Sequence, residues 1–454
     1  MAISLLIVGH ANTGKTSLIR TLMRDRRFGE VDNRSGTTRH VEEIPLSVKG
    51  ETLLRLIDTP GFEDSMGLWQ TRRMAPYDQQ TNQQWLEQII TDGALTEHFD
   101  QEFKILNQLP QCDITLYLID LRQAPLEKYL NELDILACAN KPIVPILNFC
   151  NGEPSHLDTW KQCLAERQLH AHVRYDTVAF YFADERKLYQ TLQSLSPDHY
   201  DALQSLISQR QQDAQQRLQR AQNQLASTLI SCATYQHLCA SAKPSPQDQL
   251  EFESKIRIQE EHFIQQCLAI YDFQPSDVAL QNLDIDGHQW EQDLFDAQTL
   301  KSWGIQTTTV AATGAAIGAG IDILSAGLTL GTATTLGALL GAGWQTGQSF
   351  KASLVNKLRN RAVLAANSGT LIALLYRGTE LINHLHHRGH AAQVAFQTKN
   401  EVIPSKEDIG RLDKLFKKLA QRTEWQALDE TDPLPRHELI ESLTKEISHL
   451  STKN

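Results

Sequence analysis

The sequence has few of the features that mark secreted, zinc-binding or nucleic-acid-binding proteins. Its seven cysteines are scattered over 454 residues, and no two of them form a Cys-x-x-Cys pair. An odd number of separated thiols is typical of free cysteines in a reducing compartment and argues against a disulfide framework or structural zinc. Basic charge is also scarce, because 43 lysines and arginines stand against 54 aspartates and glutamates. A net charge of −11 makes RNA a less expected partner.

The N-terminus lacks a basic leader and a small-residue cleavage site. It carries an apolar run over residues 3–8 that stops at Gly9. A secretory signal needs both missing features, so we interpret the run as a buried strand and expect a cytoplasmic protein.

Short apolar runs alternate with helical stretches over the first 180 residues. This alternation predicts an α/β domain with a mostly parallel sheet covered by helices. The long connection from Phe62 to Cys112 is expected to hold a switch segment and an extra helix. The predicted strands are residues 3–8, 40–48, 53–57, 114–119, 143–147 and 172–178.

The rest of the chain has a helical pattern, with prolines at 244 and 246 that break one helix and begin the next. A chain of this length predicts two or three domains. We expect an α/β domain over 1–182, a helical region over 183–301, a glycine-rich apolar hairpin over 302–350 and a helical C-terminal region over 351–454.

Residues 9–16, GHANTGKT, match the pattern G-x-x-x-x-G-K-[ST] of phosphate-binding loops. The match follows a predicted strand and opens a predicted helix, which is the context that the pattern requires. Glycines let the backbone wrap closely around phosphates, and the N-terminus of the helix adds positive potential. Lys15 is expected to contact the β- and γ-phosphates, and the Thr16 hydroxyl to ligate Mg²⁺.

Two further segments suit a nucleotide switch. Asp58-Thr59-Pro60-Gly61 ends a predicted strand, where Asp58 can reach Mg²⁺ and the Gly61 amide can contact a γ-phosphate. Thr37 and Thr38 lie between the first helix and the second strand, where a threonine can close over the nucleotide. Each segment alone is also an ordinary turn sequence.

Together these motifs resemble the translation-factor-related GTPases typified by Era and TrmE. The resemblance covers roughly the first 180 residues, and by position it implies GTP hydrolysis with GTP/GDP and Mg²⁺ bound. The implied catalytic residues are Lys15, Thr38 and Gly61, and the implied metal ligands are Thr16, Thr38 and Asp58. The implied nucleotide-binding residues are Gly9, Asn12, Thr13, Gly14, Lys15, Thr16, Ser17, Thr37, Thr38, Asp58, Gly61, Asn148 and Asn151. The whole chain also resembles a proteobacterial GTPase group with a helical C-terminal domain and a glycine-rich centre.

The asparagine at position 12 carries a further implication. In the family that it resembles, this asparagine accompanies a K⁺ ion that takes the place of an arginine finger. K⁺ is therefore a second expected cofactor. The alternative is that Asn12 only caps the loop through its side chain.

The base-recognition motif departs from the family's N-K-x-D pattern. Asn148 fits its first position, but Phe149 replaces the lysine and Asn151 replaces the aspartate. An amide offers guanine one acceptor oxygen beside donors that oppose its N–H groups. Guanine preference is then weak, or another residue such as Asp158 supplies the acceptor. The family's water-orienting glutamine is also missing, since Phe62 follows Gly61.

Residues 302–350 carry a single charge, Asp322, and contain glycines spaced four apart. Two helices joined near 322–327 would each be long enough to cross a bilayer and could pack closely through their glycines. We therefore expect a hairpin that inserts into or docks on the inner membrane, with a lipid or membrane protein as partner. The alternative is a tightly packed hairpin inside a helical domain, or a contact between copies of the chain.

The sequence thus predicts a GTP-hydrolysing conformational switch that acts at the inner membrane. One alternative is a GTPase linked to RNA, ribosomes or tRNA modification. Another is a structural protein whose oligomerisation, at least to a homodimer, is controlled by nucleotide.

Overall fold

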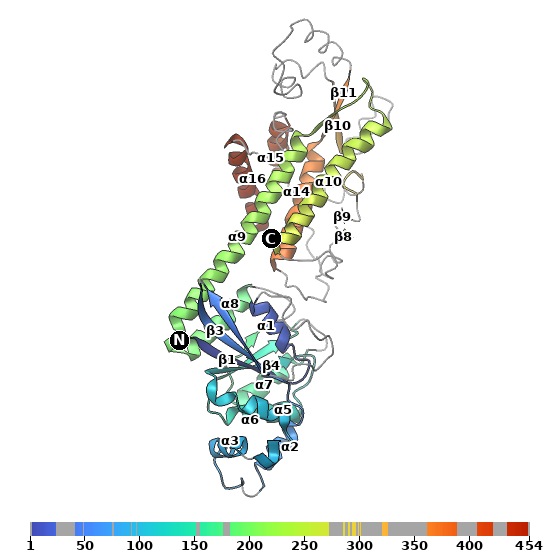
Figure 1. Ribbon diagram of the computed structural model, residues 1–454. Helices are drawn as coiled ribbons and strands as arrows, with labels where there is room; N and C mark the ends of the chain where they lie inside the picture. Colours follow the sequence, from blue (N-terminus) through green and yellow to red (C-terminus); the bar gives the residue numbers. More distant parts are fainter. Residues whose placement is uncertain are drawn as a thin grey trace. The chain divides into compact units, whose positions relative to one another are not determined.

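The structure is a computed structural model (Figure 1). The described residues are 2–23, 41–48, 50–74, 77–91, 93–96, 98–150, 155–175, 182–271, 285–286, 289–290, 293–296, 298, 300, 320–325, 361–387, 406–420 and 434–452. The chain forms two compact units: residues 1–214 with 387–394, and residues 215–386 with 395–454. The boundary after Ala214 falls inside helix α9 (Tyr200–Thr234).

A six-stranded sheet forms the centre of the first unit, in the order β2-β3-β1-β4-β5-β6. Every neighbouring pair is parallel except β2 and β3. The predicted mostly parallel sheet is therefore confirmed. The strands are β1 (Ile3–Gly9), β2 (Glu42–Val48), β3 (Glu51–Asp58), β4 (Ile114–Asp120), β5 (Ile143–Asn148) and β6 (Val173–Arg174). The last strand is shorter than the predicted 172–178, of which residues 176–178 lie outside the described part of the chain.

Alternate residues of each strand enter two different cores, because successive side chains of a strand point to opposite faces. Ile3, Leu5 and Ile7 pack with apolar residues of α1 (Lys15–Met23), α8 (Phe182–Leu195) and the first turns of α9. Leu6 and Val8 pack on the other face with apolar residues of helices between residues 65 and 166. Both faces are covered, which is why the central strands β1 and β4 are mostly apolar.

The long connection between β3 and β4 is helical. It contains α2 (Ser65–Thr71), α3 (Asn82–Thr91), α4 (Gly93–Thr96), α5 (Asp100–Leu106) and the short helix η1 (Leu109–Gln111). Trp85 of α3 is fully buried and packs edge-on against Trp69 of α2, with ring centroids 5.8 Å apart. One extra helix was expected here, and the structure contains more. After β4 come α6 (Glu127–Ala137) and α7 (Leu157–Glu166).

The first unit continues beyond the expected boundary at residue 182. Leu188 and Tyr189 of α8 and Leu203 of α9 are fully buried against the sheet. Arg210 of α9 donates to the Leu22 carbonyl at 2.7 Å, which joins α9 to the end of α1. A short helix, η2 (Pro197–His199), links α8 to α9.

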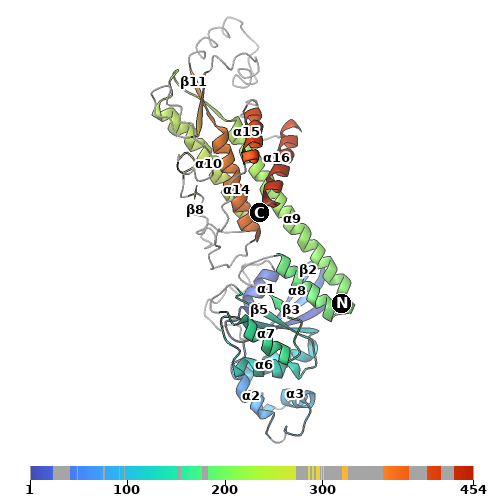
Figure 2. The same cartoon turned by 180° about the vertical axis from the view of Figure 1, so that it is seen from behind.

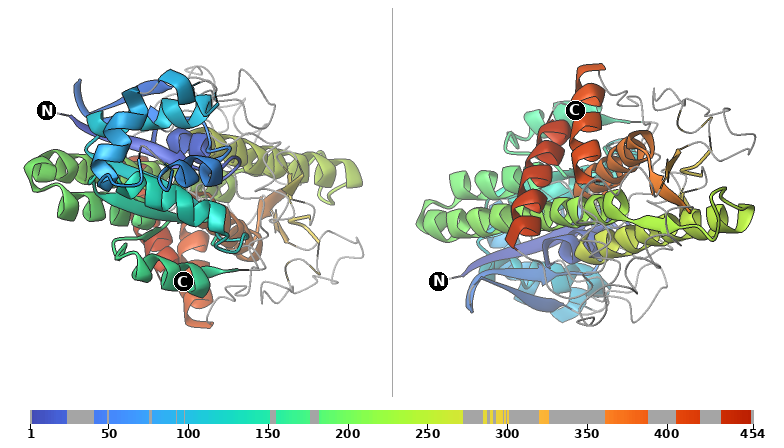
Figure 3. Two further views of the ribbon diagram at one scale, coloured as in Figure 1. Left: turned by 90° about the horizontal axis from the view of Figure 1, so that it is seen from below. Right: turned by 90° about the horizontal axis from the view of Figure 1, so that it is seen from above.

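The second unit is mainly helical, as predicted. Its helices are the C-terminal part of α9, α10 (Pro246–Tyr271), α14 (Ser368–His387), α15 (Lys406–Leu419) and α16 (Leu434–Thr452). Figures 2 and 3 show α9 and α10 side by side in this unit, and they share one apolar core with α14. Ser245 and Asp248 cap α10, because each side chain accepts from the other residue's backbone amide.

Two small sheets of the second unit were not predicted. One has the order β10-β11-β7, from Ile321–Ser325, Ala362–Ala366 and Gln236–Leu238. The other pairs β8 (Ile285–Asp286) with β9 (Gln289–Trp290).

The strand β10 corrects one expectation about the glycine-rich segment. A helix-to-helix connection was predicted near residues 322–327, but residues 321–325 form a strand that pairs antiparallel with β11. Ile321 is buried in the domain core while the neighbouring Asp322 is exposed, as successive residues of a strand point to opposite faces. The rest of the predicted hairpin, residues 302–319 and 326–350, lies outside the described residues. Of the helices that are described, none has the length and apolarity needed to cross a membrane.

Candidate nucleotide site

The phosphate loop leaves β1 at Gly9 and enters α1 at Lys15. A Cβ atom at Gly9 would lie 2.8 Å from the Leu118 carbonyl oxygen and from Thr13 Oγ1, so only glycine fits. Gly14 has a φ of +96°, a conformation that favours glycine. The two glycines of the motif are thus required by close packing and by backbone conformation. Asn12 has a φ of +64°, which asparagine tolerates better than most residues.

Lys15 is buried, with 8% of its surface exposed. Its Nζ donates to the carbonyl oxygens of Gly9 at 3.1 Å and His10 at 3.0 Å. Burial lowers the pKa of Lys15 to about 8, and the nearby carboxylates of Asp58 and Glu132 partly oppose this effect. A buried cation curled onto its own loop is suited to an anionic ligand that would replace these carbonyl partners.

Asn148 connects the loop to the opposite side of the site. Its Nδ2 donates to the Thr13 carbonyl at 2.8 Å, and its Oδ1 accepts from the Phe149 amide at 2.8 Å. The side chain is fully buried at the end of β5. Asn148 therefore connects the phosphate loop to the backbone at Phe149, where the segment after β5 begins. The sequence motif alone does not reveal this role.

The Asp58–Gly61 segment lies directly against the phosphate loop. A Cβ atom at Gly61 would be 2.8 Å from the Ala11 amide nitrogen, and the backbones of His10 and Phe62 form a parallel bridge. Thr59 donates to the Ile7 carbonyl at 2.7 Å and fixes the end of β3 to β1. Asp58 is 2% exposed. Residues 9–16 and 58–61, which are far apart in the sequence, are thus in contact.

The residues present fit a magnesium ion. Thr16 lies beside Lys15 in the first turn of α1. Asp58 is close enough to Lys15 for its charge to oppose the lowering of the lysine pKa by burial. A hydroxyl and a carboxylate are the hard oxygen donors that Mg²⁺ prefers, with phosphate oxygens completing its shell. Thr16 and Asp58 would hold the ion, which would supply positive charge against the negative charge of the phosphates. Among the described residues, no group of three or more His, Cys, Asp or Glu side chains is arranged to hold a metal ion.

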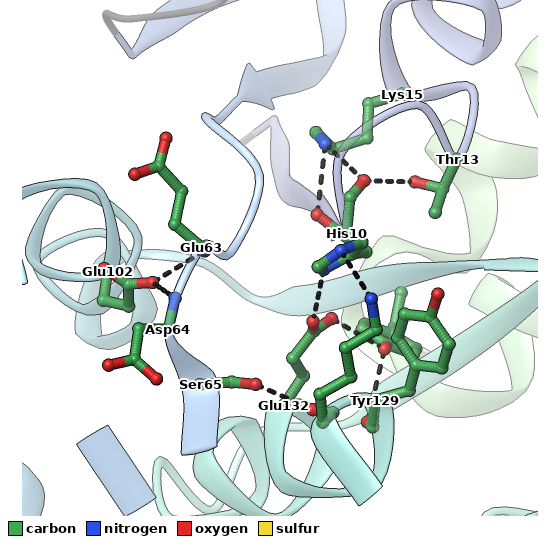
Figure 4. A network of polar contacts seen from close by, with 12 residues as sticks. His10, Thr13, Lys15, Glu63, Asp64, Ser65, Glu102, Tyr129 and Glu132 are labelled. Atoms are coloured by element: carbon green, nitrogen blue, oxygen red, sulfur yellow. Dashed lines mark hydrogen bonds and ion pairs between the residues drawn. The ribbon is translucent and has the colours of Figure 1, made fainter. Parts of the chain in front are cut away.

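A polar network behind the loop was not predicted from the sequence (Figure 4). His10 Nδ1 lies 3.0 Å from Glu132 Oε1, and Lys128 Nζ lies 3.1 Å from His10 Nε2. Tyr117 donates to Glu132 Oε2 at 2.8 Å. Burial and the Glu132 charge raise the pKa of Tyr117 well above its usual value. The signal for this network was weak, since His10 occupies a variable position of the motif and Glu132 lies on a distant helix, α6.

On the base side, Phe149 replaces the family's lysine and has a φ of +55°. The guanidinium of Arg122 lies 3.8 Å from the centre of its ring. Arg122 in turn donates to both carboxylate oxygens of Asp120, at 2.9 and 2.8 Å. An aromatic ring with a fixed cation therefore stands at the position of the expected lysine.

The structure brings together Gly9, Asn12, Thr13, Gly14, Lys15, Thr16, Ser17, Asp58, Gly61 and Asn148 of the predicted site residues. Thr37, Thr38 and Asn151 lie outside the described residues. Asp158 lies in the first turn of α7.

Two family models match the chain. One described as 50S ribosome-binding GTPase matches residues 4–149, and one described as Domain of unknown function (DUF3482) matches residues 161–445. The N-terminal domain is therefore a P-loop GTPase domain, as predicted, and homologues of this family imply GTP hydrolysis.

Several known proteins are similar to the N-terminal part of this chain. The tRNA modification GTPase MnmE of Helicobacter pylori (strain ATCC 700392 / 26695) is 32% identical over 146 residues, which are 32% of this chain and 25% of that protein. GTPase Der of Campylobacter curvus is 25% identical over 157 residues, 35% of this chain and 27% of that protein. The chain spans about a quarter of the length of these curated relatives. A crystal structure of Era with MgGDPNP and a 16S ribosomal RNA segment has 18% identity, a TM-score of 0.31, and coverage of 43% of this chain and 56% of that one.

Proposed function

The chain belongs to the family described as Domain of unknown function (DUF3482), and because a P-loop GTPase domain precedes that region, we propose that the protein hydrolyses GTP as a conformational switch. The observation that carries the proposal is the contact between the phosphate loop and Gly61. A γ-phosphate held by the loop would also meet the Gly61 amide. Its loss on hydrolysis would change the position of the segment that leads into α2.

The first experiment measures GTP binding and phosphate release by the full-length protein. Lys15→Ala removes the buried cation and is expected to abolish both. Lys187→Ala is the matched control, because Lys187 is an exposed lysine on α8 whose side chain is 63% exposed. Wild-type protein that binds no guanine nucleotide, or a Lys15→Ala variant that hydrolyses GTP normally, would refute the proposal.

For base recognition, we propose that the stacked pair of Phe149 and Arg122 takes the place of the family's lysine as a platform at the base. The fixed guanidinium, held by Asp120, supports this role. Phe149→Ala is expected to weaken binding of GDP, and Phe149→Lys to recover it. Equal loss of affinity in both variants would show that the ring does more than fill the lysine position.

Potassium is proposed as an activator because Asn12 occupies the position that accompanies this ion in the GTPases that the sequence resembles. Its exposed side chain on a left-handed turn is compatible with that role and with simple capping. Turnover in K⁺ should exceed turnover in Na⁺, and Asn12→Ala should remove the difference. Equal wild-type rates in the two salts would favour capping.

We also propose that residues 302–350 attach the protein to the inner membrane. The support is compositional, namely stretches of 20 and 28 uncharged residues on the two sides of Asp322. Because residues 321–325 form a strand, we expect the uncharged stretches before and after it to contact the membrane as two separate segments. Flotation with anionic vesicles tests this attachment, with a variant lacking residues 327–349 as control. Protein that stays with the soluble fraction would refute it.

Binding to RNA that weakens with added salt would instead favour the alternative of an RNA-linked GTPase, which is raised by relatives named for tRNA modification.

A further inference from the structure

Three residues separate Gly61 from helix α2, and two of them have side chains already engaged. Phe62 is 1% exposed and belongs to the core on the α2–α7 face of the sheet. Asp64 is the N-cap of α2 and accepts from the Gly67 amide at 2.8 Å. Glu63 is exposed, and its carboxylate has no hydrogen-bond or ionic partner among the residues that the structure describes.

The backbone at Glu63 is nevertheless fixed. Glu102 of α5 is 2% exposed, and its Oε1 accepts from the amides of both Glu63 and Asp64, each at 2.7 Å. Hydrogen bonds from amides to a carboxylate are stronger than neutral ones, and two on one oxygen define the direction of this short segment. Figure 4 shows the carboxylates of Glu63 and Asp64 pointing in opposite directions from it.

Other groups near the phosphate loop are occupied. Both ring nitrogens of His10 are engaged, one by Glu132 and the other by Lys128. Lys15 is bound to two carbonyl oxygens of its own loop. Among the described residues next to Gly61, Glu63 therefore offers a carboxylate that is both unengaged and held on a fixed backbone.

We propose that Glu63 orients the water that attacks GTP, and that Glu102 is the positioning residue that holds Glu63 beside the phosphate loop. The inference deepens the proposed function and rests on it. Glu63 accepts a hydrogen bond from the water, whose oxygen forms a bond to the γ-phosphorus. The bond from that phosphorus to the β–γ bridging oxygen breaks, and GDP leaves with that electron pair. The water's proton passes to a phosphate oxygen and then to solvent, so nothing is oxidised or reduced.

This assignment explains how the site can work without a glutamine after Gly61. The buried Phe62 occupies that position and cannot contact water. Glu63, the next residue, then supplies the hydrogen-bond acceptor for the water. Glu102 of α5, in the connection between β3 and β4, supplies the carboxylate that fixes the backbone of Glu63. The site thus draws its positioning residue from α5, whose Phe103 and Ile105 are buried in the core.

The test compares single-turnover hydrolysis and nucleotide affinity in four variants of the full chain. Glu63→Ala should lower the hydrolysis rate by about 10²- to 10⁴-fold with GTP affinity unchanged, as expected for a group that acts on the reacting water. Glu63→Gln should retain a large part of the rate, since its amide oxygen can still accept from water. Glu102→Ala should lower the rate by about 10²-fold through misplacement, again with affinity unchanged. Glu102→Gln should recover most of that loss, because its Oε1 can still accept from both amides.

Glu87→Gln is the matched control, because Glu87 is an exposed carboxylate on α3 of the same connection. It should leave rate and affinity unchanged. A Glu63→Ala variant that hydrolyses bound GTP at the wild-type rate would overturn the inference and leave the proposed function intact. Wild-type protein that binds GTP without hydrolysing it would overturn both. Loss of affinity in Glu102→Ala together with failure of Glu102→Gln to recover the rate would reduce Glu102 to a structural role.

Discussion

The buried amine of Lys15 makes the stability of the nucleotide-free GTPase domain depend on pH in a way that can be measured. Its pKa is about 8 in the folded protein, against an ordinary value of 10.5. Burial is the main cause, since removing a cation from water disfavours its charged form. The perturbation that isolates this effect is Lys15→Met, which keeps a chain of similar size but has no charge.

The direction of this pH dependence follows from the number of protons that the folded and unfolded chains bind. Between pH 8 and 10.5 the unfolded chain holds the Lys15 proton and the folded chain has lost it, so stability rises with pH. The gap of about 2.5 between the two pKa values corresponds to about 3 kcal/mol at 1.36 kcal/mol per unit. The contribution is fully present above pH 10.5 and is lost as the pH falls to 8. At neutral pH the charged amine therefore opposes folding, and an anionic ligand would offset that cost.

The assay measures amide hydrogen exchange in β1 and β3, which reports the free energy of unfolding of the first unit. It is done without nucleotide at several pH values from about 7 to 10. The stability of wild-type protein relative to Lys15→Met should rise by about 2–3 kcal/mol over this range, because other titrating groups cancel in the difference. A difference that does not change with pH would refute the reasoning. It would mean that the amine keeps an ordinary pKa and that its contacts with the Gly9 and His10 carbonyls compensate for burial.

Three further predictions concern packing and base recognition. A Cβ atom at Gly378 would lie 3.0 Å from Leu225 Cδ2 and 3.2 Å from Phe263 Cε1, whereas one at Gly410 would meet nothing within 4 Å. Gly410→Ala should therefore stabilise the second unit by about 0.5–1 kcal/mol in urea unfolding, and Gly378→Ala should be about 1–3 kcal/mol worse than that, so equal effects would contradict the packing. Arg377 is 3% exposed and lies 3.3 Å from Glu260 Oε1, so Arg377→Met should cost about 3–5 kcal/mol in thermal unfolding. The double variant with Glu260→Leu should recover most of this loss, and no recovery would argue against the pair as its source. Asn151→Asp should tighten binding of GDP by about 1–3 kcal/mol relative to XDP in fluorescence titrations, and an unchanged ratio would show that another residue reads the base.

Local sequence patterns predicted the nucleotide-binding half of the molecule well. The parallel strands β1, β3, β4 and β5 were predicted close to their observed bounds, because covered parallel strands are apolar on both faces and leave short apolar runs in the sequence. The last strand, β6, is shorter than predicted. Gly9 and Gly14 were identified because close backbone approach and a left-handed φ exclude side chains. The helical nature of the second unit followed from its residue pattern, but three short strands at 236–238, 321–325 and 362–366 did not. Each of these strands is stabilised by pairing with a segment far away in the chain.

The amino-acid sequence by itself determined that a phosphate loop opens the chain, that a parallel sheet supports it and that a helical region follows. These features depend on residue types at fixed short spacings, which act through neighbouring backbone. Only the tertiary structure decided which distant side chains complete the site. Glu132 meets His10 across 122 residues, and Glu102 binds the amides of Glu63 and Asp64 from a separate helix. Such contacts depend on how helices pack on the sheet, and this packing brings together residues that no short sequence pattern connects.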